Sequence, residues 1–136
     1  MLSTLMISTL LRDAQELQPD VVRLRRAIHR HPELGLHLPR TQAAVMQALD
    51  GLGLSIRKGE QLTSVVATLE GARPGPSILL RADMDALPVQ EETGLEFASQ
   101  VEGVMHACGH DAHVAMLVGA GRLLARRRDQ LAGRVV

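Results

Sequence analysis

The chain has 136 residues, 46% of them hydrophobic, and its 15 basic residues balance 15 acidic ones for a formal net charge of +0. A neutral chain without a concentrated basic surface gives no reason to expect a nucleic-acid partner. The single cysteine excludes an internal disulfide and favours a reduced, cytoplasmic location, and the apolar stretch at the N-terminus is too short to span a membrane.

The first expected element is a helix that opens at Pro19. Apolar residues such as Val21, Leu24 and Ile28 recur after it at helical spacing, and Pro32 disfavours helix at the residue before it. Residues 1–18 are expected to form a leader that is poorly ordered or supplies the first turn of this helix. Residues 19–136 are expected to form one domain.

A second helix is expected at about residues 41–52, where apolar side chains line one face and glycines follow. Three strand-like runs come next, at residues 54–58, 64–70 and 77–81. The last, "SILLR", is a continuous apolar run of the kind that is buried on both faces of a sheet. The Gly- and Pro-rich residues 71–76 between the second and third runs are expected to form a loop.

After a long loop, a further helix is expected from Ala112 to about Arg128, with Asp111 as its N-cap, and "GRVV" at residues 133–136 is typical of a strand. Helices, strands, a helix and a new strand in this order predict an α/β fold, with a mixed sheet and flanking helices.

Chemically versatile residues are expected at one edge of this sheet. Asp83 and Asp85 follow the run "SILLR", and residues 106–113 precede the last helix. Ligands of open α/β sheets bind beyond the carboxyl ends of the strands. The two acids and the Cys/His cluster "MHACGHDAHV" are therefore expected to share one crevice.

Cys108 and His110 leave three interpretations open. In extended backbone, residues two positions apart project to the same side, so a thiolate and an imidazole could bind one metal ion. A His-activated cysteine nucleophile is the second interpretation, although the partner of such a cysteine is usually distant in sequence. The third is a buried structural cysteine beside surface histidines. The spacing alone does not choose between the metal site and this third interpretation.

The other candidate residues have plain alternatives. Asp83 and Asp85 could bind a metal ion or orient a ligating histidine, or they could be solvated acids flanking Arg81. His29 and His31 stand near the expected end of the first helix, where a histidine commonly does no more than interact with the helix dipole.

Three segments together are similar to one family. "RRAIHRHPELG" (25–35), "LLRADMDALPVQEETG" (79–94) and "VMHACGHDAHVAMLVGAGRLL" (104–124) resemble the M20 metallopeptidases. They are most similar to the amidohydrolase branch, which includes hippurate hydrolases and hydrolases of N-acyl and indole-acetyl amino acids. The resemblance extends over about residues 24–136.

The resemblance implies a two-metal, zinc-peptidase-like catalytic domain, of which residues 19–136 would be the N-terminal part. It implies that Cys108 and His110 are metal ligands and that Asp85 supports catalysis by orienting a ligand at the metal. Asp83 falls where other branches carry a ligating histidine, and the resemblance assigns no ligand role to His106 or His113. The implied cofactors are two divalent ions per complete site, zinc or manganese.

The implied activity is metal-dependent hydrolysis of the amide bond of small N-acyl amino acids such as hippurate. The general base (a glutamate), the remaining ligands and a smaller lid domain would all lie beyond Val136, and family members are often homo-oligomers. The chain is therefore expected to be inactive alone and to need the missing C-terminal portion as a partner. The alternatives are a non-catalytic remnant of a split gene and, ranked lower, a cysteine-nucleophile hydrolase.

Overall fold

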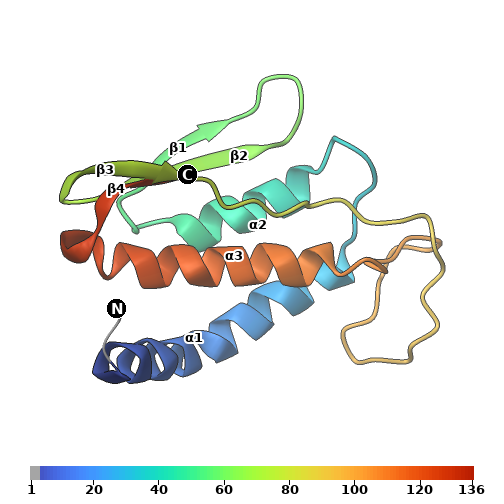
Figure 1. Cartoon of the computed structure of the whole chain (residues 1–136). Coiled ribbons are helices and arrows are strands. Elements are labelled where there is room, and N and C mark those ends of the chain that lie inside the picture. Colours follow the sequence, from blue (N-terminus) through green and yellow to red (C-terminus); the bar gives the residue numbers. More distant parts are fainter. Residues whose placement is uncertain (1–3) are drawn as a thin grey trace.

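The computed structural model describes residues 4–136, with side chains from Ile7 onward (Figure 1). Its elements, in chain order, are α1 (Thr4–Arg30), α2 (Pro39–Leu49), β1 (Ser55–Lys58), β2 (Val65–Glu70), β3 (Arg73–Ile78), α3 (His110–Ala125), the 3-10 turn η1 (Arg128–Gln130) and β4 (Ala132–Val135). The four strands form one sheet in the order β1-β2-β4-β3. Strand β4 pairs antiparallel with β2 and parallel with β3, so the predicted α/β fold with a mixed sheet is confirmed.

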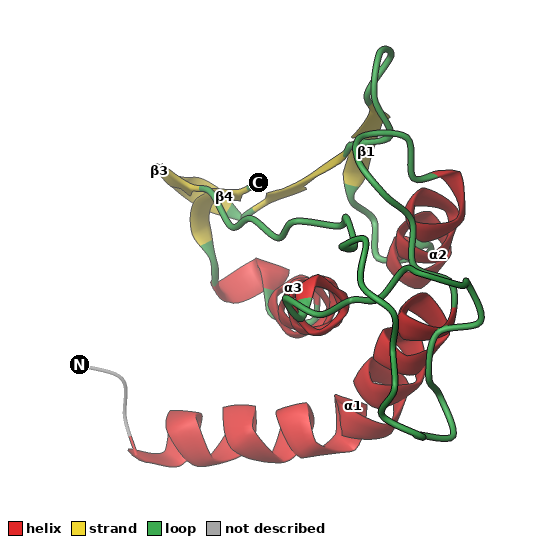
Figure 2. Cartoon of the chain, turned by 90° about the vertical axis from the view of Figure 1, so that its right-hand side faces the viewer, coloured by secondary structure: helices red, strands yellow, loops and turns green. Residues whose placement is uncertain are grey.

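All three helices lie on the same side of the sheet, and α3 lies between the sheet and α1 (Figure 2). The core fills the space between these layers. Its buried side chains come from all three helices and are Ile28, Val45, Leu49, Val114 and Val118. None of the helices within residues 4–136 has the length and apolar character that a membrane span requires.

Helix α1 begins well before the predicted start at Pro19, which lies in its interior. A proline inside a helix removes one backbone hydrogen bond and costs ~3 kcal/mol. The helix continues through Pro19 because residues on both sides of it are buried. Leu17 and Ile28, three turns apart, both pack against the rest of the chain. The helix bends partway along, as expected of a proline in its interior (Figures 1 and 2). Residues 4–18 are thus helical rather than a poorly ordered leader, and residues 1–3 of that leader lie outside the described residues.

Helix α2 matches the prediction closely, but a residue outside the helix caps its N-terminus. Its N-cap position is Leu38, which has no side chain able to cap. The carboxylate of Glu33 accepts hydrogen bonds from the backbone N–H groups of Arg40 (3.1 Å) and Thr41 (2.8 Å) and from the Thr41 hydroxyl (2.8 Å). These bonds satisfy first-turn donors that have no partner within the helix.

Strand β3 corrects two predictions. It occupies residues 73–78, so most of the expected loop 71–76 is strand. Its prolines are tolerated because β3 is an edge strand of the described sheet, with no neighbour on one side. The expected burial of "SILLR" on both faces is also wrong: Ile78 is 55% exposed and Leu79 73% exposed. Strands β1, β2 and β4 agree with the sequence-based prediction to within about a residue at each start.

Helix α3 begins at His110, and its N-cap is Gly109 rather than Asp111. Gly109 adopts a left-handed conformation with φ 77°. Asp111 lies inside the first turn and is completely buried. Its carboxylate does not cap its own helix, because it binds side chains of α1 instead.

Candidate functional site

The three segments that carry the family resemblance meet at one end of the molecule. The C-terminal end of α1, the start of α3 and the long loop between β3 and α3 lie there together (Figure 1). The backbone N–H of Ala86 donates to the carbonyl of Glu33 (2.8 Å), and Leu87 and Met105 exchange two backbone hydrogen bonds (2.9 and 3.0 Å). Short bridges of main chain thus draw residues 33, 86 and 105 to one place.

Asp85 and His110 form the first side-chain contact of the site. Nδ1 of His110 lies 2.9 Å from the carbonyl oxygen of Asp85 and 3.0 Å from its Oδ1. Both oxygens only accept hydrogen bonds, so Nδ1 is the atom that carries the proton and donates. In the neutral ring Nε2 is then unprotonated, with a lone pair that can bind a metal ion.

Cys108 lies two residues before His110, across a tight turn. It is an exposed free thiol, and Gly109 between the two residues has φ 77° and ψ 21°. The prediction from spacing required extended backbone between Cys108 and His110. The backbone is not extended there, because His110 already begins α3. A thiol and an imidazole Nε2 suit part of a zinc site. Within residues 4–136, no group of three or more His, Cys, Asp or Glu residues is arranged to hold a metal ion.

A buried polar network lies directly beneath this turn. Oδ2 of Asp111 accepts hydrogen bonds from His29 Nδ1 (2.8 Å) and Arg25 Nε (2.6 Å). On the other side of the imidazole, His29 Nε2 lies 3.3 Å from Oε1 of Glu91. The side chain of His29 is 2% exposed and that of Asp111 is 0% exposed. The expectation that His29 does no more than interact with the helix dipole is therefore wrong, because its ring is buried between two carboxylates.

Both carboxylates are held in their charged form. Burial alone would raise the pKa of Asp111, but the hydrogen bonds from His29 and Arg25 outweigh it, and the pKa lies below its ordinary value of 3.8. Burial also acts to raise the pKa of Glu91. Hydrogen bonds from the Thr93 hydroxyl, the Ser99 backbone N–H and His29 outweigh it and lower this pKa below 4.5. Both carboxylates are thus ionised at neutral pH, and the Arg25 guanidinium pairs with that of Asp111.

The remaining candidates have different surroundings. Asp83 pairs with Arg81 at the surface and does not join His110, in keeping with the alternative of a solvated acid. His113 is exposed, with its ring centroid 6.0 Å from that of His110. His106 is buried, its burial lowers its pKa, and neither of its ring nitrogens finds a hydrogen-bond partner within residues 4–136. His31 is half-buried.

The sequence predicted none of the contacts of the buried network, which joins Arg25, His29, Glu91 and Asp111. Arg25 and His29 stand four residues apart on one helix, so they share a face, and that spacing was a usable signal. Asp111 was noticed but assigned a role as a helix cap. Nothing in the local sequence distinguishes Glu91 from the neighbouring Glu92, because only the fold of the loop buries one and exposes the other.

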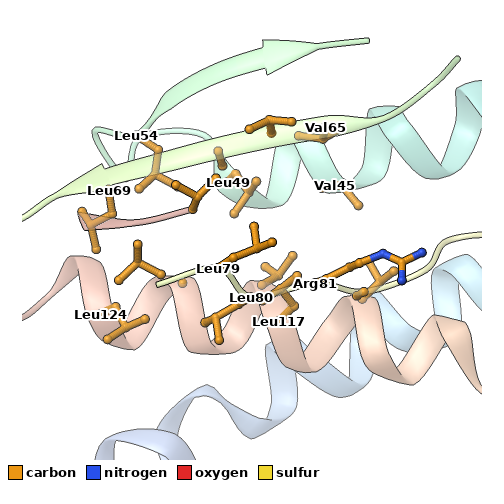
Figure 3. Close-up of a pocket in the computed structure, with 18 of the residues that line it drawn as sticks. Val45, Leu49, Leu54, Val65, Leu69, Leu79, Leu80, Arg81, Leu117 and Leu124 are labelled. Atoms are coloured by element: carbon orange, nitrogen blue, oxygen red, sulfur yellow. The ribbon is translucent and has the colours of Figure 1, made fainter. Parts of the chain in front are cut away.

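An apolar cavity of about 280 Å³ lies elsewhere, between the sheet and α3. Figure 3 shows Leu49, Leu69, Leu117 and Leu124 around it, with Leu79 and Leu80 from the segment after β3. Arg81 is the only polar residue among those that line it, and Asp85, Cys108 and His110 are not among them. The cavity is therefore apolar and separate from the candidate site.

The fold and the site define an α/β chain in which a Cys-Gly-His turn at the start of a helix lies beside an aspartate. Residues 79–136 match the peptidase family M20/M25/M40. The chain is 45% identical over 131 residues to thermostable carboxypeptidase 1 of Saccharolobus solfataricus, covering 96% of this chain and 33% of that protein. It is 44% identical over 124 residues to an N-acyl-L-amino acid amidohydrolase of Geobacillus stearothermophilus, covering 91% of this chain and 34% of that protein.

The fold gives the same assignment. A crystal structure of a Bacillus subtilis protein, described as a dinuclear metal-binding peptidase of the M20 family, matches with a TM-score of 0.84 and 43% identity. That match covers 89% of this chain and 34% of the other. Residues 79–136 are thus similar to the M20 peptidases in sequence and in fold, and the chain spans about a third of the length of the curated relatives it matches.

Proposed function

We propose that the chain supplies part of the metal site of a metal-dependent amidohydrolase that acts on N-acyl amino acids. In this proposal Cys108 and His110 are metal ligands, and Asp85 is the positioning residue that fixes the ring of His110. The observation that carries the proposal is the pair of hydrogen bonds from His110 Nδ1 to Asp85, which leaves Nε2 as the ligating atom. Histidines that bind metals characteristically donate their other ring nitrogen in this way.

The cofactors of the complete site are two divalent ions, zinc or manganese. When bound, such ions supply Lewis-acid polarisation of the amide carbonyl and lower the pKa of a bound water towards ~7. The residues of this chain bind and orient. Cys108 provides a sulfur ligand on the exposed side of the turn, and Asp85 accepts the hydrogen bond from Nδ1 of His110, which in the neutral ring leaves the Nε2 lone pair for the metal ion. Sulfur ligation favours zinc.

The names of two relatives support the substrate class. One is named an N-acyl-L-amino acid amidohydrolase and another an N-acetylcysteine deacetylase, and both names describe cleavage of an amide that links an acyl group to an amino acid. Hippurate belongs to the same chemical class and is the proposed test substrate. We place the activity in the cytoplasm, where a free thiol ligand stays reduced. In this proposal the complete enzyme forms homo-oligomers.

The 136-residue chain alone is proposed to be inactive or nearly so. A catalytic zinc is held by three protein ligands, whereas this proposal assigns two to the described residues. The partner that completes the site is a polypeptide that supplies further ligands and a carboxylate base, as the C-terminal two-thirds of the relatives would. The alternative is that the chain has no catalytic role at all. The same observation supports it, because the described residues supply an incomplete set of ligands.

Cobalt binding tests the ligand assignment. Co²⁺ added to the purified chain should give a sulfur-to-cobalt charge-transfer band, which Cys108→Ser should abolish and His110→Ala should weaken. His113→Ala is the matched control, because it removes a neighbouring exposed histidine that the proposal leaves out of the site. A band that survives Cys108→Ser would overturn the assignment of Cys108.

Activity assays test the rest of the proposal. The chain should show no turnover of hippurate or other N-acyl amino acids when zinc, manganese or cobalt is added. Addition of a polypeptide that carries the C-terminal portion of a relative should produce activity that chelators remove. Turnover by the chain alone that survives chelators but is lost on alkylation of Cys108 would instead establish a cysteine nucleophile.

A further inference from the structure

We propose that His29 is a positioning residue for the candidate metal site. By holding Asp111, it fixes the first turn of α3 and with it the relative placement of Cys108 and His110. This inference rests on the proposed function, since it concerns how the metal ligands are held. It adds to the proposed site a residue that is far from the ligands in sequence.

His29 links three separate parts of the chain. Its ring stands at the end of α1, its Nδ1 donates to Asp111 in the first turn of α3, and its Nε2 faces Glu91 in the long loop. Glu91 in turn accepts hydrogen bonds from the Thr93 hydroxyl (2.5 Å) and the Ser99 backbone N–H (2.6 Å), which organise that loop. One buried imidazole therefore joins the three motif segments.

The position of Asp111 makes it an effective anchor for the ligands. It directly follows His110, and its side chain is 0% exposed, so the start of α3 cannot shift without moving a buried charge. In the turn before it, main-chain hydrogen bonds join the Gly109 N–H to the His106 carbonyl (3.1 Å) and the Ala112 N–H to the Gly109 carbonyl (3.0 Å). Side-chain packing adds no restraint at Gly109, which has φ +77° and, apart from its chain neighbours, no atom within 4 Å of the point where a Cβ would stand. The side-chain anchor at Asp111 supplies the restraint that packing at Gly109 does not.

Two side chains, those of Asp85 and His29, restrain the neighbouring residues His110 and Asp111 and can be called two anchors of the helix start. Asp85 sets the orientation of the His110 ring, and His29 sets the placement of the helix start through Asp111. Arg25 shares the second task, because its Nε donates to the same Oδ2 atom (2.6 Å). If either anchor is lost, His110 can still ligate, but it is less well placed relative to Cys108.

The composition of the network also indicates a role beyond stability. A buried charged cluster gives little net stabilisation over well-packed apolar residues of similar volume, whereas it can specify one arrangement. His29, Glu91 and Asp111 have side chains that are at most 2% exposed. Apolar packing could join α1 to α3 as well, but it would not fix the direction of one carboxylate in the first turn.

Two conservative variants separate the two hydrogen bonds of His29. In His29→Asn, the amide nitrogen stands close to the place of Nδ1 and can still donate to Asp111. In His29→Gln, the longer side chain places its nitrogen near Nε2, facing Glu91, and Asp111 loses this donor. Leu69→Ala is the stability control, because it opens a cavity at a buried residue of β2 that has no part in the network.

The measurement is the dissociation constant for Co²⁺, followed by the sulfur-to-cobalt band, with the thermal midpoint of each variant recorded alongside. We expect His29→Gln to weaken cobalt binding about 10–100-fold, the range found when supporting residues of metal ligands are replaced. His29→Asn should stay within a few-fold of the unmodified chain. Leu69→Ala should lower the thermal midpoint without changing the dissociation constant.

The outcomes separate this inference from the proposed function. Absence of the band in the unmodified chain would overturn the ligand assignment and the inference together. A band with equal dissociation constants in the unmodified chain and in His29→Gln would overturn the inference alone. Should His29→Gln fail to fold, Arg25→Gln removes the other donor to the same oxygen and should weaken cobalt binding several-fold, and an unchanged value there would also overturn the inference.

Discussion

His110 donates from Nδ1 to two acceptors of a single residue, the carbonyl oxygen of Asp85 at 2.9 Å and its Oδ1 at 3.0 Å. The two residues stand 25 positions apart, and the loop between them closes through the backbone pairing of Leu87 with Met105. A mutation of Asp85 can remove only the hydrogen bond to its side chain, because the hydrogen bond to its backbone carbonyl remains.

Asp85→Ala should therefore weaken metal binding without abolishing it. The carboxylate is lost but the backbone acceptor remains, so we expect a decrease in Co²⁺ or Zn²⁺ affinity near the lower end of the ~10–100-fold range for such supporting residues. Asp83→Ala is the matched control, because the carboxylate of Asp83 pairs with Arg81 instead. Metal titrations of both variants check this, and an equal loss in the control would contradict it.

Glu91→Gln should destabilise the chain at neutral pH by about 1–3 kcal/mol, through weaker hydrogen bonds to a buried charged group. The folded-state pKa of Glu91 lies below its ordinary value of 4.5, so the unfolded chain binds its proton more readily. The stability that the carboxylate contributes is thus complete above about pH 4.5 and is lost as the pH falls through the folded pKa. The difference in free energy of unfolding between the unmodified chain and Glu91→Gln should therefore decrease as the pH is lowered.

Urea unfolding at pH 7, 5, 4 and 3 measures the effect of Glu91→Gln. Glu92→Gln is the control, since it removes the same charge from an exposed neighbour. A pH-dependent difference of equal size in both variants would assign the effect to net charge and not to the contacts of Glu91 with His29, Thr93 and Ser99.

Gly133→Ala should destabilise the fold by at least about 2 kcal/mol, from left-handed backbone strain and overpacking together. Gly133 has φ +81°, and an added Cβ would stand 1.9 Å from the carbonyl oxygen of Pro76 in the neighbouring strand. Gly51→Ala is a close control, because Gly51 has φ +72° with no atom within 4 Å of the added carbon. Thermal unfolding should show a clearly larger loss for Gly133→Ala, and equal losses would show that the close approach of the strands has no effect.

Ile78→Lys should reduce self-association of the chain. Ile78 is 55% exposed on the edge strand β3, and an apolar edge with unpaired backbone groups invites pairing with another chain. Leu11→Lys adds the same charge at a site on α1 that is 59% exposed. Sedimentation velocity should show less aggregate for Ile78→Lys than for Leu11→Lys, whereas equal improvement would indicate a general effect of charge.

Local patterns determined much of the fold and the outline of the site. The apolar periodicity located α2, α3, β1, β2 and β4 to within a few residues, because side-chain spacing reports which face of a local element is buried. The resemblance of the three motif segments to one family singled out Asp85, Cys108 and His110 as candidates, whereas the spacing of these residues alone left the alternatives open.

The tertiary structure decided what local spacing could not express. His29 and Asp111 are 82 positions apart, and only the packing of α1 against α3 brings the imidazole to the carboxylate and so draws Asp111 away from a capping role. Tertiary packing also explains why α1 begins at Thr4 and why β3 lies at an exposed edge. A buried face can carry a helix through a proline, and whether a strand lies at an edge depends on its neighbours. Burial and pairing belong to the assembled fold, whereas periodicity describes one segment at a time.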